Sequence, residues 1–147
     1  MIKRIFLLTA CCIFASGLMA MDSVAFNGKI SALKLTLSNL TGQPETSLFI
    51  SIDPQEEDVL LTSDAFYFTG AIKGKQFDLE AIDVNAAYKH RGIGSALINF
   101  FLDKDIARYL GYTTIITLPA SAEGQAFFKK FGFEKMRSSN KVIKKIL

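Results

Sequence analysis

The chain has 147 residues, which is enough for one ordinary domain and too few for two. Its residues are 50% hydrophobic and 21% charged, a composition typical of a globular protein rather than a disordered one. The net charge is only +3, and the sequence has no dense run of basic residues, so we do not expect it to bind nucleic acid.

Cysteine and histidine are too rare for several kinds of chemistry. Cys11 and Cys12 both fall within the first twenty residues, and His90 is the single histidine of the chain. The remaining sequence therefore cannot form a disulfide, a cysteine-type zinc site, a multi-histidine metal site or a cysteine nucleophile.

Residues 1–20 have the layout of a secretory signal peptide. A basic start at Lys3 and Arg4 precedes an apolar run from Ile5 to Ala20, and polar sequence returns at Asp22. The run is shorter than the roughly 20 apolar residues that a spanning helix needs. We expect cleavage and export to the periplasm or the exterior. The alternatives are an uncleaved anchor, with residues 1–20 as the only membrane contact, and a cytoplasmic protein. Residues 22–147 form a single predicted domain.

The first half of that domain has the pattern of strands. Leucines at every second position predict a strand over residues 31–37, and further strands are predicted over 47–52, 65–69 and 77–84. An acidic loop, residues 53–58, lies between the second and third of these strands. Such a run is usually solvated surface, although it could attract a cationic amine.

The second half changes to helical spacing. An apolar stripe between Gly94 and Gly111 predicts one helix about four turns long, followed by a strand over 113–118. A short helix over 122–131 and a hairpin between 133–137 and 142–147 complete the chain. The order predicts an α/β (α+β) domain with a mixed, mostly antiparallel sheet and helices on its faces.

The most informative segment joins the strand ending at Val84 to the next helix. Gly92 and Gly94 stand at the first turn of that helix, where backbone N–H groups have no internal partner and the helix dipole is positive. Glycines allow the backbone to approach an anion closely, and Lys89 and Arg91 add charge. The segment therefore predicts a phosphate or pyrophosphate site. It does not fit the dinucleotide fingerprint, because Leu97 replaces the third glycine, nor the P-loop, because no Lys-Ser/Thr pair follows.

Two segments resemble the signatures of the GNAT family of N-acetyltransferases. Residues 89–94, Lys-His-Arg-Gly-Ile-Gly, are similar to its acetyl-CoA loop, Gln/Arg-x-x-Gly-x-Gly/Ala. Residues 118–134 are similar to its second signature, whose core is Phe-Tyr-x-x-x-Gly-Phe. The resemblance covers residues 77–147. It implies a GNAT-like fold, acetyl-CoA as co-substrate, and an amine, small or on a protein, as acceptor.

The resemblance also implies a cofactor site. The pyrophosphate would lie on the N–H groups of residues 91–95, and the pantetheine arm would run beside the strand ending at Val84, whose backbone would hold the thioester carbonyl. The implied cofactor-binding residues are Val84, Lys89, His90, Arg91, Gly92, Ile93, Gly94, Ser95, Ser121 and Phe128. Ser121 has a simpler alternative role as a helix N-cap. No metal is implied.

Catalysis is harder to assign than binding. Phe128 occupies the position where the family commonly has the tyrosine that protonates the leaving sulfur, and phenylalanine has no proton to give. Glu80 is the candidate base, because it lies four residues before Val84 on one strand and should share its face. A solvated Glu80, or one paired with a lysine, is the alternative. His90 is expected to add a phosphate contact rather than to act as a base.

The first half departs from the family, which normally has one or two helices between its first two strands. The predicted strands leave room only for a turn between Leu37 and Ser47, so the N-terminal helices should be reduced. The acceptor side would then be open or completed by a second subunit of a homodimer. The leading function is an acetyl-CoA-dependent N-acetyltransferase. The alternatives are an exported acyl-CoA-binding module with weak or no activity, and an exported interaction domain. A signal peptide favours both alternatives, because acetyl-CoA is cytosolic.

Overall fold

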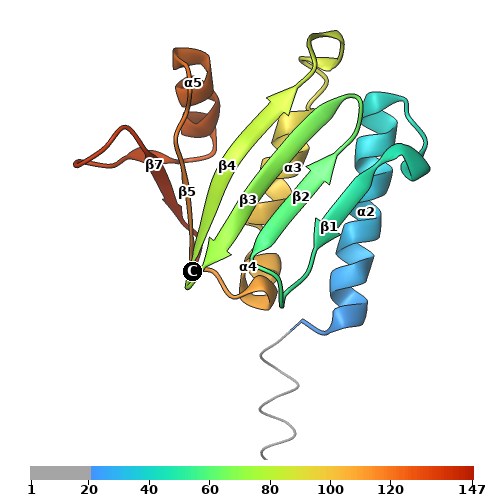
Figure 1. Ribbon diagram of the computed structural model, residues 1–147, viewed down its shortest axis with the longest axis horizontal. Coiled ribbons are helices and arrows are strands. Elements are labelled where there is room, and N and C mark those ends of the chain that lie inside the picture. The colour runs from blue at the N-terminus through green and yellow to red at the C-terminus, as the bar shows by residue number, and fades with distance from the viewer. Residues whose placement is uncertain (1–20) are drawn as a thin grey trace, which may run out of the picture.

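Seven strands form one sheet in the computed structural model, which describes residues 21–147 (Figure 1). Their order is β1-β2-β3-β4-β5-β7-β6, and only the β4–β5 pair is parallel. The strands are β1 (Phe49–Ile52), β2 (Asp58–Thr62), β3 (Phe66–Lys73), β4 (Gln76–Val84), β5 (Thr114–Thr117), β6 (Glu134–Lys135) and β7 (Val142–Lys145). The helices are α2 (Ser23–Thr41), α3 (Ile93–Leu102), α4 (Lys104–Leu110) and α5 (Ala122–Lys130), with short 3-10 turns η1 (Glu45–Ser47) and η2 (Ala86–Tyr88). The predicted mixed, mostly antiparallel sheet is confirmed.

The strand predicted over residues 31–37 is wrong, because this segment belongs to α2. Its leucines also satisfy a helical period: Leu33 and Leu37 are buried on one side, whereas Leu35 is 53% exposed. Asp22 caps the helix by accepting a hydrogen bond from the N–H of Ala25 at 2.8 Å. The alternation of leucines was thus one part of a longer helical pattern.

Strand β2 was not predicted, and the chain between β1 and β2 contains no helix. Residues 53–57 make a short loop, and Asp58, predicted as loop, begins β2. The long helix α2 precedes β1 instead of separating two strands. The expectation of reduced N-terminal helices rested on the strand over 31–37 and is wrong in that form: α2 is a 19-residue helix before β1, although no helix separates β1 from β2.

The helix predicted after Gly94 is two helices, α3 and α4, separated at Asp103. This carboxylate caps α4, accepting hydrogen bonds from the N–H groups of Asp105 at 2.8 Å and Ile106 at 3.1 Å. Lys29 of α2 donates to it at 2.6 Å. Burial alone would raise the pKa of Asp103, but the hydrogen bonds from Lys29, Ile106 and Asp105 outweigh it and lower the pKa below its usual value. The remaining elements of the second half, β5, α5 and the β6–β7 hairpin, are confirmed.

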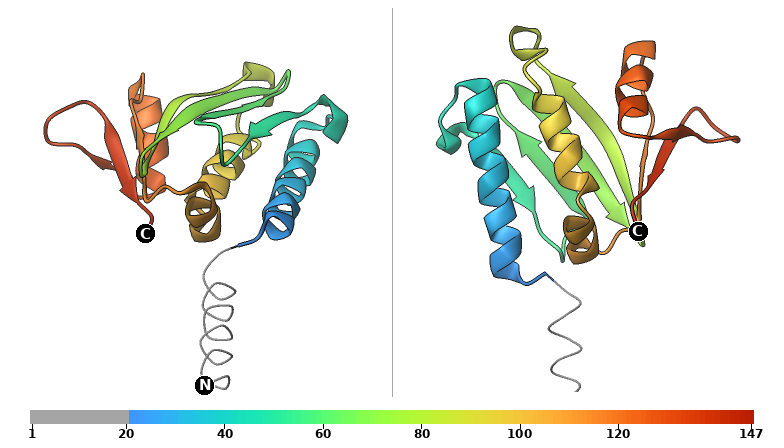
Figure 2. Two further views of the ribbon diagram at one scale, coloured as in Figure 1. Left: turned by 60° about the horizontal axis from the view of Figure 1, so that its bottom comes forward. Right: turned by 180° about the vertical axis from the view of Figure 1, so that it is seen from behind.

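Helices α2, α3 and α4 cover one face of the sheet (Figure 2). Between them and the sheet lies an aromatic core in which the rings of Phe68 and Phe101 stack 4.8 Å apart, and Phe77 packs against both. The buried hydroxyl of Tyr112 donates to the carbonyl of Phe101 at 2.6 Å. The opposite face of β1–β4 carries no helix from residues 21–147 (Figure 2).

Two predictions concern the N-terminal segment and membrane association. The predicted signal peptide, residues 1–20, lies outside the described residues. Within residues 21–147, none of the helices combines the length and apolar character needed to cross a membrane.

Candidate active site

One edge of strand β4 is paired along its whole length apart from one bulged residue, and the other edge is paired over only half of it. Along β3 it pairs from Gln76, opposite Lys73, to Val84, opposite Phe66. Along β5 it pairs only from Gln76 to Leu79. Beyond Leu79 the two strands diverge (Figure 1), and residues 80–84 face a cleft instead of a neighbouring strand.

A β-bulge lies where the cleft begins. Leu79 pairs with Gly70 and Ala81 with Thr69, so Glu80 has no partner on β3. A side chain at Gly70 could not be accommodated, because its Cβ would lie 2.6 Å from the carbonyl oxygen of Asp78.

The bulge shifts the alternation of β4 by one residue. Leu79 is buried in the core, and Val84 faces the same side, because it pairs with the buried Phe66. Glu80, the neighbour of Leu79, therefore points to the opposite side of the sheet. The prediction that Glu80 and Val84 share a face is wrong, because the extra residue breaks the period of two.

The loop between β4 and α3 forms one end of the cleft. Asn85 holds its start, donating its backbone N–H to Ala65 at 2.8 Å and accepting from the N–H of Ala87 at 3.2 Å. His90 and Gly92 have φ of 63° and 86°, left-handed conformations that turn the chain into α3. Gly92 is the N-cap of α3 and offers no side-chain acceptor, so the first N–H groups of the helix are left for a ligand.

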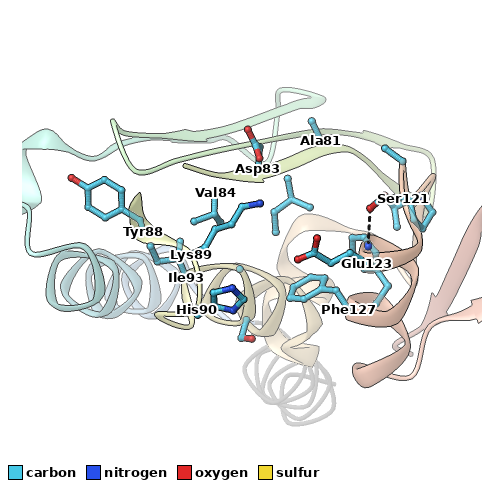
Figure 3. A pocket seen from close by; sticks show the side chains of 18 of the residues that line it. Ala81, Asp83, Val84, Tyr88, Lys89, His90, Ile93, Ser121, Glu123 and Phe127 are labelled. Atoms are coloured by element: carbon cyan, nitrogen blue, oxygen red, sulfur yellow. Dashed lines mark hydrogen bonds between the residues drawn. The ribbon is translucent and has the colours of Figure 1, made fainter. Parts of the chain in front are cut away.

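The cleft has a volume of about 560 Å³ and lies between β4, the start of α3, the end of β5 and α5 (Figure 3). Most of the predicted site residues line it: Glu80, Val84, Lys89, His90, Gly92, Ile93, Gly94, Ser95, Ser121 and Phe128. Arg91 does not. Its guanidinium lies 5.1 Å from the centroid of the Tyr88 ring and donates to the carbonyl of Ala87 at 3.3 Å. Arg91 is exposed and is not among the residues that line the cleft.

Helix α5 forms the wall opposite β4. Ser121 is its N-cap, accepting from the N–H of Gly124 at 3.1 Å (Figure 3), so the simpler of the two predicted roles applies to its side chain. Phe128 is 3% exposed and packs edge-on against Phe127 and Phe133, with ring centroids 5.2 Å apart in both pairs. It therefore contributes to the core of this wall as well as to the cleft.

The sequence analysis missed several lining residues, among them Phe127, Glu123 and Tyr88. Phe127 packs against α3, where a Cβ on Gly94 would lie 3.3 Å from its Cζ atom. Its position directly before Phe128 in the second signature could have indicated it. Glu123 points its carboxylate into the cleft, as does the ammonium of Lys89 (Figure 3). Tyr88 accepts a hydrogen bond from the side-chain amide of Gln43 at 3.3 Å. No sequence signal marked Glu123 or Tyr88.

The chemistry of the cleft is that of an anion site with an open strand edge. One end offers helix N–H groups and the charge of Lys89, and the β4 wall offers unpaired backbone groups. Within residues 21–147, no three His, Cys, Asp or Glu side chains are grouped so that they could hold a metal ion. The arrangement suits an extended ligand with a phosphate group at one end.

Comparisons with known proteins agree with this description. The family model "Acetyltransferase (GNAT) domain" matches residues 56–135. Among solved structures, the GNAT domain of S. lividans PAT is 19% identical, with a TM-score of 0.53 over 65% of this chain and 64% of that chain. Ard1 from Thermoplasma volcanium is 18% identical, with a TM-score of 0.49 over 79% of each chain. No curated protein matches the sequence.

Proposed function

Because the chain belongs to the GNAT acetyltransferase family, with acetyl-CoA as co-substrate, we propose that it transfers the acetyl group to the nitrogen of an amine. The observation that carries this proposal is the meeting, in one cleft, of the open edge of β4 and the uncapped N-terminus of α3. A helix N-terminus alone would suit any anion. The adjoining open strand edge adds a track for an extended arm that carries amide groups.

The pyrophosphate would lie on the first N–H groups of α3, between Gly92 and Ser95, with the ammonium of Lys89 beside it. The pantetheine arm would follow residues 80–84, because their backbone groups on the β5 side have no strand partner. A backbone N–H near the bulge would then stabilise the negative charge that develops on the thioester oxygen during attack.

Transfer requires one proton to move. The neutral amine attacks the thioester carbon, the C–N bond forms and the C–S bond breaks. The nitrogen then loses a proton and the coenzyme sulfur gains one. Glu80 is the proposed acceptor of the nitrogen's proton: it is exposed, sits at the bulge and lines the cleft. We expect Glu80→Gln to lower kcat while leaving acetyl-CoA affinity unchanged.

The second candidate function is an acyl-CoA-binding module with weak or no activity. It is favoured by Phe128, which borders the cleft but has no hydroxyl to protonate the sulfur. General acid catalysis is worth roughly 10²–10⁴-fold, which sets the size of the possible deficit. We expect Phe128→Tyr to raise turnover. An unchanged rate in a well-folded variant would rule out the missing acid as the limiting factor.

Calorimetry of the full-length chain with acetyl-CoA and CoA tests binding, and release of the CoA thiol with a panel of amines tests transfer. Gly92→Glu should abolish binding, because it places a carboxylate against the pyrophosphate. Gly74→Glu is the matched control: Gly74 also has a left-handed φ, 61°, and open space around its Cα, but it lies in the β3–β4 turn. Equal losses of binding in the two variants would contradict the proposed site.

Export through residues 1–20 is a further part of this proposal. It is supported by the basic start and apolar run of the sequence. N-terminal sequencing of material from the periplasm or medium should give a chain that begins after Gly17 or Ala20. An intact Met1 on soluble cytoplasmic protein would contradict it. We also propose that the protein forms a homodimer. Sedimentation should then give twice the mass of the chain.

A further inference from the structure

The face of the sheet opposite α2–α4, here called the outer face, presents side chains in register across four strands. One row runs from Phe49 of β1 through Thr62 of β2 and Tyr67 of β3 to Asp83 of β4. Phe49 is 55% and Tyr67 47% exposed, so two aromatic rings stand in solvent on this face. No helix of residues 21–147 covers them (Figure 2).

A hollow of about 280 Å³ lies at the β4 end of this row. Its charged side chains are Asp64, in the β2–β3 turn, and Asp83, and it also includes the Tyr67 ring and the polar groups of Ser63 and Asn85. Within residues 21–147, neither carboxylate has a cation within ion-pair distance. The hollow therefore has a negative charge that no described side chain neutralises.

The hollow and the cofactor cleft are on the two sides of the end of β4. Asp83 lines both. Its side chain points away from the cleft, in the same direction as that of Ala81 (Figure 3), so the carboxylate belongs to the hollow and only the strand separates the two. A ligand in the hollow would lie beside the strand segment that the proposed pantetheine arm follows on its other side.

The lining of the hollow suits a cation in two ways. A cation would be attracted to the carboxylates of Asp64 and Asp83. The aromatic face of Tyr67 is a further favourable contact for an ammonium group.

We infer that the outer face binds the acceptor, and that this acceptor is a cationic amine with a second positive group. This inference rests on the proposed acetyl transfer and adds the acceptor class and the face from which it approaches. One ammonium group binds at Asp64 and Asp83 against Tyr67. The second nitrogen, as the free amine, reaches the thioester past the open edge of β4.

The test compares two acceptors of equal length, 1,5-diaminopentane and 5-aminopentanoate, in the acetyl-transfer assay with full-length protein. Both offer the same primary amine, but the far end is an ammonium in one and a carboxylate in the other. We expect kcat/KM to be at least tenfold higher for the diamine, with a KM that rises with salt because surface charges are screened.

The double variant Asp64→Asn/Asp83→Asn should reduce this preference about tenfold by raising the KM for the diamine, with the Kd for acetyl-CoA unchanged. Glu134→Gln is the matched control, because it removes an exposed carboxylate at β6, at the far end of the sheet. Equal use of the two acceptors, a preference for 5-aminopentanoate, or an unchanged preference in the double variant would overturn the inference. A chain that binds no acetyl-CoA would instead overturn the proposed function.

Discussion

The two edges of β4 differ in their pairing: the edge toward β3 is closed, and the edge toward β5 is half open. Toward β3 the strand is hydrogen-bonded from Gln76 to Val84 and accommodates the unpaired Glu80 as a bulge. Toward β5 the pairing ends at Leu79 and the remaining residues border the cleft. The open edge depends on the paired one, because β3 holds residues 80–84 in place while their backbone groups on the β5 side stay free for a ligand.

The side chains beneath the two edges differ in the same way. The rings of Phe68, Phe77 and Phe101 fill the core under the closed edge. The cleft is bordered by Phe127, which is partly buried and lies against α3 at Gly94. Substitutions on the closed side should therefore change the free energy of unfolding, and substitutions around the cleft should change ligand affinity.

The largest stability effect is expected at the closed edge, for Gly70→Ala. The new Cβ would overlap the Phe77 ring and the carbonyl of Asp78, so β3 or β4 must move at the bulge. Overpacking of this kind costs about 3 kcal/mol. Urea unfolding followed by circular dichroism measures it.

Gly28→Ala is the matched control for that substitution. Gly28 is exposed in the middle of α2 with no atom within 4 Å of its added Cβ. The same change should stabilise the protein by about 0.5–1 kcal/mol, because alanine is the better helix former. If Gly70→Ala unfolded at the wild-type urea concentration, the close approach of β3 and β4 at the bulge would not be a constraint.

A smaller loss is expected at Asp103, also on the closed side. Asp103→Ala removes the cap of α4 and the contact with Lys29, and loss of such a cap costs about 1–2 kcal/mol. Asp103→Asn keeps a capping oxygen and removes only the charge. Because the folded pKa of Asp103 is lowered, the charge stabilises the protein above the unfolded pKa, near 3.9. That contribution is lost as the pH falls through the folded pKa.

The stability difference between wild type and Asp103→Asn should therefore be largest near neutral pH and shrink below about pH 4. Thermal unfolding over pH 3–7 measures it. Acetyl-CoA affinity should not change in either variant, since Asp103 lies at the opposite end of α3 from the cleft. A loss of affinity would mean that the junction of α3 and α4 affects acetyl-CoA binding in the cleft.

Sequence reasoning succeeded where a pattern is local and failed where it depends on the neighbours. The sequence correctly predicts Gly92 and Gly94 at the start of a helix, because this prediction depends only on the backbone properties of glycine and of a helix N-terminus. The strand predicted over 31–37 failed because three leucines at every second position also fit one side of α2, where Leu33 and Leu37 are buried and Leu35 is not. Only contact with the rest of the core decides between the two periods.

The errors in the site have the same origin. Arg91 carries the right charge beside the anion loop, but its guanidinium lies on the ring of Tyr88, a contact that spacing does not reveal. The prediction for the direction of the Glu80 side chain assumed a regular strand. The bulge that breaks this regularity lies opposite Gly70, a residue of another strand. Asp64 and Asp83 are far apart in sequence and meet only through the β2–β3–β4 pairing.

Tyr112→Phe probes the core next to the point where β5 begins. The hydroxyl is fully buried and donates to the carbonyl of Phe101; burial and the nearby charge of Asp103 raise the pKa of Tyr112 above its usual range. Removing the hydroxyl leaves that carbonyl without its partner, at a cost of about 1 kcal/mol. Calorimetric unfolding measures it. Wild-type stability would indicate that the carbonyl finds another donor.

The smallest stability change, and the sharpest contrast between the two edges, is expected for Gly94→Ala. Alanine favours the helix by up to about 1 kcal/mol, and the tight contact of 3.3 Å with the Phe127 ring opposes this gain. The ring is only partly buried and can tilt, so the two effects should nearly cancel in the free energy of unfolding. The tilt must move the ring within the cleft, because Phe127 and Gly94 both line it. We therefore expect an unchanged Tm together with weaker acetyl-CoA binding by calorimetry. A lowered Tm with unchanged affinity would assign this contact to the core and not to the site.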